Sequence, residues 1–163
     1  MHKLTKKEET SGTMKNTAAM TQQFFLYRDT AGRVQINALL CDETLWLTQK
    51  AMAELFEVER SVVTKHIGNI YKKDELSEET VCANFAHTAA DGKSYNTAFY
   101  NLDMIIAVGY RVNSKQATAF RLWATEVLRE YIIKGFAMDD ERLKKVNKFE
   151  ADYFREMLDR IVE

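Results

Sequence analysis

The 163-residue chain contains no proline and only two cysteines. The absence of proline fits a domain of helices and hairpins without rigid linkers. Cys41 and Cys82 lie in apolar surroundings, without the CxxC spacing of a zinc or redox site. We therefore expect both thiols to be reduced and buried, and we expect no metal ion or other cofactor.

Long hydrophobic runs are also missing. No run approaches the roughly 18 apolar residues of a membrane helix, and the N-terminal stretch lacks the apolar core of a signal peptide. These absences predict a cytoplasmic protein without a membrane partner. The net charge of −1 creates no general attraction to nucleic acid, so any contact with DNA has to come from a local basic surface.

The apolar content of 46% is sufficient for one ordinary core. We predict an α+β fold, a winged helix-turn-helix-like domain with small antiparallel hairpins followed by long C-terminal helices. Residues 1–22 are polar and without periodicity, which predicts a disordered lead-in. Residues 23–136 form the predicted winged domain. We expect residues 137–163 to form a C-terminal helix that is truncated and that serves dimerisation or acts as a linker.

Residues 47–73 have the spacing of two short helices joined by a tight turn. Thr48 is the expected cap of the first helix and Ser61 that of the second. The turn position that is usually glycine in such motifs is Glu57. Apolar residues three and four apart predict the buried faces, and they are Met52, Leu55, Phe56, Val63, Ile67 and Ile70.

The opposite face of the second helix is polar and basic. Arginine and lysine supply charge for phosphates, while short polar side chains can read a base edge in the major groove. A solvated helix surface gives the same pattern, and the DNA interpretation is the one we favour. The candidate DNA-binding residues on this helix are Arg60, Ser61, Thr64, Lys65, His66, Asn69, Lys72 and Lys73.

Residues 24–41 and 81–101 have the pattern of hairpins, and residues 44–47 that of a short strand. Asp91-Gly92 suggests a two-residue turn in the second hairpin, which places Phe85 opposite Ala98 and Thr88 opposite Tyr95. A hairpin that follows a recognition helix is the wing of a winged helix. Lys93, at its tip, is a further candidate for contact with a phosphate, although a lone lysine at a turn is more often only solvated.

Residues 102–112 are expected to form a core helix, and a long amphipathic helix follows, capped by Asn113 or Ser114 and ended by Gly135. Residues 74–80 are expected to form a polar connector. The inward stripe of the long helix consists of Ala117, Phe120, Ala124, Val127, Leu128 and Tyr131.

Two stretches resemble the N-terminal part of the bacterial RhuM family of virulence-associated proteins: WLTQKAMAELFEVERSVVTKHIGNI and the run from Phe99 to Lys145. The segment ATAFRLW from Ala117 is also similar, more loosely, to Bro-N type domains of phage antirepressors. The resemblance implies a DNA-binding module encoded near mobile elements, and it brings no catalytic site with it. The His-Pro-Phe and Gly-Asn-Gly-Arg elements of the Fic domains that some relatives carry are absent from this sequence.

Three functions follow from these patterns. The first is DNA binding, with residues 61–73 in the major groove, residues 81–101 as the wing, and a homodimer as a possible assembly. The alternative is a protein–protein interaction module whose helix-turn-helix does not bind DNA. An enzyme is the third, and we do not expect it, because the sequence has no catalytic motif and suggests no small-molecule substrate.

Overall fold

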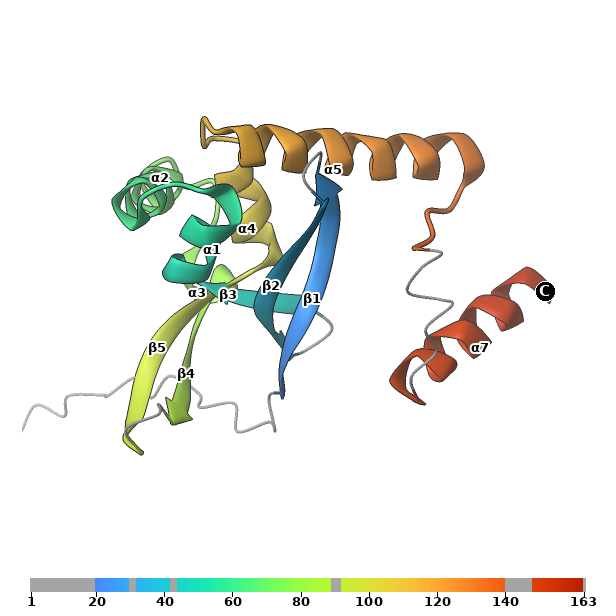
Figure 1. The fold of residues 1–163 in the computed structure, drawn as a ribbon, viewed down its shortest axis with the longest axis horizontal. Helices are drawn as coiled ribbons and strands as arrows, with labels where there is room; N and C mark the ends of the chain where they lie inside the picture. The colour runs from blue at the N-terminus through green and yellow to red at the C-terminus, as the bar shows by residue number, and fades with distance from the viewer. Residues whose placement is uncertain (1–19, 30–31, 42–43, 89–91, 140–147, 163) are drawn as a thin grey trace, which may run out of the picture. The chain divides into compact units, whose positions relative to one another are not determined.

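The structure is a computed structural model that describes residues 20–29, 32–41, 44–88, 92–139 and 148–162 (Figure 1). Strands and helices follow one another along the chain, so the predicted α+β class is confirmed. The chain divides into two compact units, one ending at Trp123 and one starting at Ala124. The domain boundaries predicted from the sequence stay predictions, although β1 begins at Met20, inside the segment expected to be disordered.

The elements up to the unit boundary are five strands and the helices that pack on them. The strands are β1 (Met20–Asp29), β2 (Gly32–Cys41), β3 (Thr44–Thr48), β4 (Cys82–Thr88) and β5 (Ser94–Asn101). The helices are α1 (Gln49–Phe56), α2 (Arg60–Lys72), α3 (Glu78–Val81), α4 (Leu102–Gly109) and the first part of α5 (Lys115–Lys134). The second unit holds the rest of α5 and α7 (Lys148–Val162).

The strands form one antiparallel sheet in the order β1-β2-β3-β5-β4. The short strand β3 joins the two hairpins, because it pairs with β2 through Leu39 opposite Trp46 and with β5 through Leu47 opposite Tyr100. The two small hairpins predicted from the sequence are therefore parts of a single sheet. Helices α1 and α2 lie between β3 and β4 in the chain, so the sheet positions both ends of this helical segment (Figure 1).

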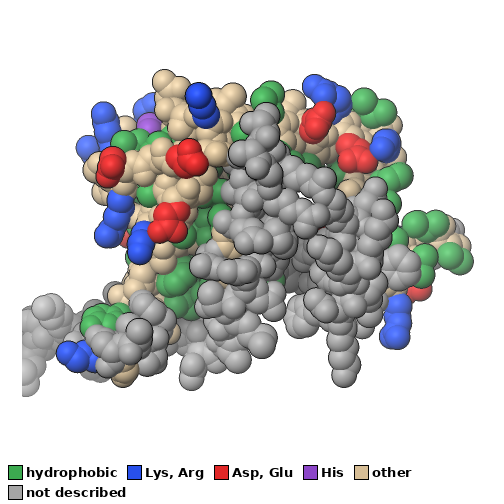
Figure 2. Space-filling view, viewed as in Figure 1, with side chains coloured by type: hydrophobic (Ala, Val, Ile, Leu, Met, Phe, Trp, Pro, Cys, Tyr) green, Lys and Arg blue, Asp and Glu red, His purple; other side chains and the backbone are tan. Residues whose placement is uncertain are grey.

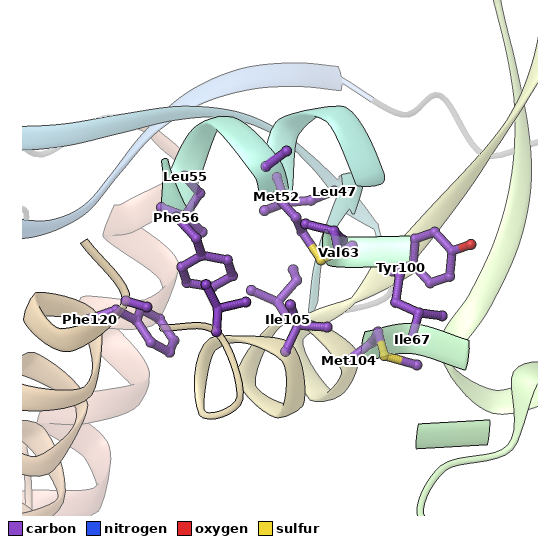
Figure 3. Packing of buried hydrophobic residues seen from close by; sticks show 14 of the residues in the cluster. Leu47, Met52, Leu55, Phe56, Val63, Ile67, Tyr100, Met104, Ile105 and Phe120 are labelled. Carbon is purple, nitrogen blue, oxygen red and sulfur yellow. The ribbon is translucent and has the colours of Figure 1, made fainter. Parts of the chain in front are cut away.

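Successive residues of β3 point to opposite faces of the sheet. Leu47 is fully buried against the helices, in a core that Figure 3 shows closing around Met52, Phe56 and Ile105. Trp46 belongs to a second cluster with Leu39 and Cys41, packed against partly buried aromatic rings. Both inward stripes of the predicted helix pair are confirmed by burial, and these side chains are Met52, Leu55, Phe56, Val63, Ile67 and Ile70.

The predicted register of the β4–β5 hairpin was wrong by one residue. Phe85 lies opposite Thr97, and Thr88 lies opposite Ser94. This pairing differs by one residue from the pairing that a two-residue turn at Asp91-Gly92 requires. The rings explain the register, because Phe85 packs edge-to-face on Phe99 of β5 and on Trp46 of β3, with centroid distances of 5.4 and 5.7 Å.

Helix termini confirm some predicted caps and correct one. The Thr48 hydroxyl accepts a hydrogen bond from the Ala51 amide at 3.1 Å, and Asn101 and Ser114 cap α4 and α5 in the same way. Helix α2, however, begins one residue before Ser61, with Glu59 as an N-cap that makes no side-chain capping bond. The predicted connector 74–80 also contains the start of the short helix α3.

The predicted inward stripe of α5 is buried in one half of the helix only. Ala117 and Phe120 are buried in the core of the first unit. Val127, Leu128 and Tyr131, which continue the stripe in the second unit, are exposed by 39%, 58% and 59%. The expectation that the whole stripe faces inward was therefore wrong for the second half of the helix. That helix ends at Gly135, as predicted, where φ is +81°.

Candidate nucleic-acid interface

Helix α2 owes its two faces to the spacing of its apolar residues. Val63, Ile67 and Ile70 recur at four and three residues and are all less than 5% exposed. Ser61, Lys65, Gly68 and Lys72 are spaced by four, three and four, which puts them together on the opposite side of the helix. The buried stripe thus fixes which residues the helix presents outward.

Eight of the nine candidate residues lie on or next to α2, and most of them are exposed. Asn69 and His66 are half-buried. No hydrogen bond or ion pair engages the side chains of Lys65, Asn69 or Lys72 with any other residue that the structure describes. The exposed members of the set are Arg60, Ser61, Thr64, Lys65, Lys72 and Lys73.

Lys93 lies apart from the other candidates. It is exposed in the connection between β4 and β5, and Figure 1 shows this end of the hairpin pointing away from α2. The structure therefore brings together the residues of α2 but does not add Lys93 to that surface. A contact between Lys93 and a phosphate requires a ligand that extends along the hairpin.

The hydroxyl of Thr64 is turned toward the protein. It lies 2.7 Å from Gln49 Oε1 and 3.0 Å from the Arg60 carbonyl oxygen, and it donates its single hydrogen to one of them at a time. Gln49 in turn donates from Nε2 to the Tyr100 hydroxyl at 2.9 Å. Gln49, which the sequence analysis did not single out, thus connects α2 to β5 through α1, and the Thr64 hydroxyl is partly occupied by this connection.

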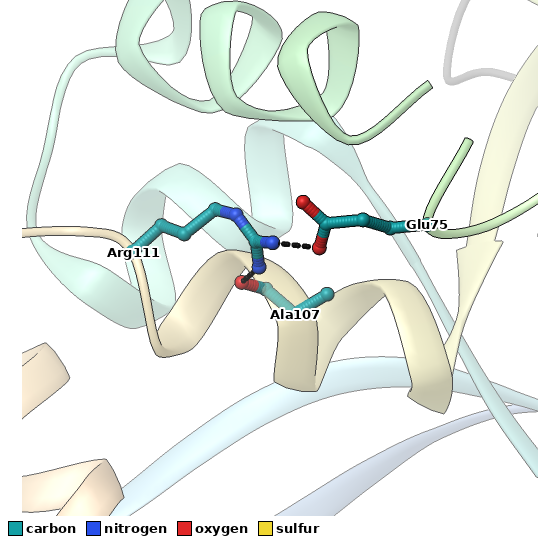
Figure 4. A network of polar contacts seen from close by, with 3 residues as sticks. All are labelled: Glu75, Ala107 and Arg111. Atoms are coloured by element: carbon teal, nitrogen blue, oxygen red, sulfur yellow. Dashed lines mark hydrogen bonds and ion pairs between the residues drawn. The ribbon is translucent and has the colours of Figure 1, made fainter. Parts of the chain in front are cut away.

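A second polar contact holds the loop after α2. The Arg111 guanidinium, which follows α4, donates to the Glu75 carboxylate and to the Ala107 carbonyl oxygen (Figure 4). Arg111 also acts on His66, since burial first, and then the charges of Arg111 and Lys65, lower the pKa of this imidazole below its usual 6.5. At neutral pH His66 therefore adds little positive charge to the surface of α2.

Carboxylates surround the basic residues of α2. Glu54, Glu57 and Glu59 line an open groove at the turn between α1 and α2, together with Lys50, Ala53 and Val58. Asp74 and Glu75 follow the other end of the helix. Figure 2 shows Lys and Arg side chains intermingled with Asp and Glu side chains over the helical part of this face. The basic surface is consequently confined to the outer side of α2.

The turn itself has a left-handed residue where the sequence has no glycine. Glu57 ends α1 with φ 49° and ψ 53°, and its amide hydrogen-bonds back to Ala53 and Glu54. This conformation costs a residue with a β-carbon about 1 kcal/mol or more. The geometry confirms that the position corresponds to the glycine of such turns.

The two cysteines pack in or against apolar clusters of the sheet. Cys41 is buried and Cys82 is half-buried, and they do not form a disulfide with each other. Burial and the nearby Glu78 carboxylate raise the pKa of the Cys82 thiol, which keeps it protonated, against a hydrogen bond with Tyr100 that acts the other way. Among the described residues, no three His, Cys, Asp or Glu side chains are grouped so that they could hold a metal ion.

The fold and the surface together define an α+β protein in which a sheet supports a pair of short helices, the second with a polar and basic outer face. Residues 80–163, just over half of the chain, match the virulence protein RhuM family. The chain belongs to this family, as the sequence resemblance indicated. The matched segment starts after α2, so it covers the β4–β5 hairpin and the long helices but not the candidate interface.

No curated protein and no solved structure matches the chain. Within the described ranges, no helix is both long and apolar enough to span a membrane.

Proposed function

We propose that the protein binds duplex DNA, with α2 in the major groove and the β4–β5 hairpin as a wing against the backbone. The observation that carries the proposal is the outer face of α2, where Lys65 and Lys72 project on one side of the helix without an ion pair to another described residue. Groups of this kind can release counterions from phosphates.

The arrangement of the elements supports the same proposal. The α1–α2 pair has a left-handed turn residue, Glu57, and is followed by a hairpin that pairs with β3. A winged helix-turn-helix needs these parts in this order. In a symmetric dimer that reads a palindrome, the two copies of α2 would lie about 34 Å apart, one turn of DNA.

The limited number of cations sets the strength of non-specific binding. Arg60, Lys65, Lys72 and Lys73 are the Lys and Arg residues on or next to α2. If all of them neutralise phosphates, the logarithm of the binding constant falls with the logarithm of salt concentration with a slope of about −4 per subunit. The flanking carboxylates weaken the attraction to phosphates. Phosphate contacts carry no sequence information, so selectivity for a preferred sequence has to come from contacts with base edges.

The test is a titration of a random-sequence duplex with the full chain at several salt concentrations. We expect Lys65→Glu combined with Lys72→Glu to abolish binding, and Asn69→Ala to relax sequence preference more than affinity. Lys115→Glu combined with Arg129→Glu is a control with the same change of charge on exposed residues of α5. If the α2 double variant retards DNA as the native chain does, α2 is not the DNA-binding element.

A protein–protein interaction module is the second candidate, and the exposed apolar residues in the second half of α5 favour it. Leu128, Tyr131, Ile132 and Ile133 are each more than half exposed, which is unusual for a surface without a partner. This function predicts a stoichiometric complex that survives high salt. DNA binding, in contrast, declines steeply under the same conditions.

A further inference from the structure

Gly68 lies in the middle of α2 without a structural reason. A β-carbon built at this position meets no atom within 4 Å. The other glycines for which the surroundings are known differ, because Gly92 and Gly135 have φ of +77° and +81°, and a β-carbon at Gly109 would clash with two rings. Glycine in the interior of a helix lowers its stability relative to alanine. At Gly68 the fold gains nothing in return.

The neighbours of Gly68 place it on the candidate interface. Lys65 precedes it by three residues and Lys72 follows it by four, so all three lie on the outer side of α2. Thr64, one turn earlier, has its hydroxyl bonded to Gln49 or to the Arg60 carbonyl oxygen. Gly68 therefore leaves a gap in the outer face of α2, and the long cationic side chains of Lys65 and Lys72 stand beside this gap.

We propose that Gly68 is the point of closest approach between α2 and the duplex, and that it determines sequence specificity. This inference rests on the proposed DNA-binding function. Ser61 and Asn69 are short, so they reach base edges only if the helix backbone comes close to the floor of the groove. A methyl group at position 68 would stand between the helix backbone and the floor of the groove. Lys65 and Lys72 are long and flexible, so they would still reach phosphates.

The experiment combines selection and binding. The native full chain is used to select duplexes from a randomised pool, and the dissociation constants of native chain, Gly68→Ala and Lys72→Ala are then measured for the recovered duplex and for a scrambled one. We expect Gly68→Ala to weaken binding to the recovered duplex about 5-fold to 100-fold, the range of one lost base contact. Binding to the scrambled duplex and the salt slope should stay unchanged.

Two further measurements distinguish a lost base contact from a lost phosphate contact and from misfolding. Lys72→Ala is the matched variant that should weaken both duplexes alike and reduce the salt slope by about one. The midpoint of thermal unfolding should rise by about 1–4 °C in Gly68→Ala, which excludes misfolding as the cause of weaker binding. If Gly68→Ala distinguishes the two duplexes as well as the native chain does, and the native chain shows salt-dependent binding, this inference is wrong and the proposed function stands. Absence of salt-dependent binding by the native chain overturns the proposed function as well.

Discussion

Replacement of Gly109 by alanine tests the packing that holds the helices together. Gly109 is the last residue of α4 and is buried. A β-carbon there would lie 2.8 and 2.9 Å from Phe120 Cε1 and Cδ1, and 2.9 Å from Phe56 Cζ. Real β-carbons essentially never approach other atoms so closely, so the rings have to move.

The rings have little room in which to move. Phe56 and Phe120 are at most 1% exposed, and they pack edge-to-face with centroids 5.4 Å apart. Phe120 also lies against Trp123 at 5.7 Å. Insertion of a methyl group into such packing costs about 1–3 kcal/mol. Alanine recovers less than about 1 kcal/mol through its greater helix propensity, because the position ends the helix.

We therefore expect Gly109→Ala to lower the free energy of unfolding by about 1–2 kcal/mol, since the cost of the inserted methyl group exceeds the gain in helix propensity. For a chain of this length the midpoint of thermal unfolding should fall by about 2–8 °C. The assay is unfolding by heat and by urea, followed by circular dichroism. A double variant with Phe120→Leu, which frees space beside the new methyl group, should lose less than the sum of the two single changes.

Gly68→Ala is the matched control for this prediction. Both changes add one methyl group to a helix, but the surroundings are open at Gly68 and occupied at Gly109. The two variants should therefore shift stability in opposite directions. If Gly109→Ala is as stable as the native chain, the close packing of Phe56 and Phe120 around α4 does not exist in solution, and the reasoning fails.

Two further predictions concern the turn and the imidazole beside α2. Glu57→Gly should raise the free energy of unfolding, measured by urea denaturation, by about 0.5–1 kcal/mol, because glycine adopts the left-handed conformation without strain. Glu57→Ala should give no gain. Equal effects of the two changes would contradict this prediction. His66 has a lowered pKa, so the unfolded state takes up the proton first and stability falls as pH drops below 6.5, levelling off below the folded pKa. His66→Gln should remove this loss of stability at low pH. The difference between the urea midpoints of the variant and the native chain should therefore change between about pH 8 and about pH 5. A difference that stays constant with pH would refute the assignment of the effect to His66.

Most features that depend on residues close to one another in the sequence could be predicted from the sequence. The buried stripes of α1 and α2 follow from apolar residues three and four apart, and the caps Thr48 and Ser114 follow from side chains that accept bonds from the next turn. Glu57 could be recognised as the turn position because it stands where helix-turn-helix motifs usually have glycine. These signals are contained within a few residues, so no knowledge of the rest of the fold is required.

Contacts between distant segments could not be predicted in this way. The Asp91-Gly92 pair is a local turn signal, but the register of β4 and β5 is also constrained by the packing of Phe85 and Phe99 with Trp46 of β3. A slip by one residue would turn those side chains to the other face of the sheet. The bond from Thr64 to Gln49 spans 15 residues, and the bond from Gln49 to Tyr100 spans 51. Nothing in the local sequence marks Gln49 as their common partner.

The two candidate functions use different surfaces and are therefore compatible. The basic face of α2 belongs to the first unit, and the exposed apolar residues Leu128, Ile132 and Ile133 belong to the second. With only four cations on or next to α2, a single subunit would hold non-specific DNA weakly at physiological salt. A second copy bound through α5 would bring a second α2 to the same duplex, and affinity would rise without new contacts within either subunit. Replacement of Ile132 and Ile133 by polar residues would then weaken DNA binding although neither residue lies on α2, and a mass measurement would show the accompanying loss of the dimer.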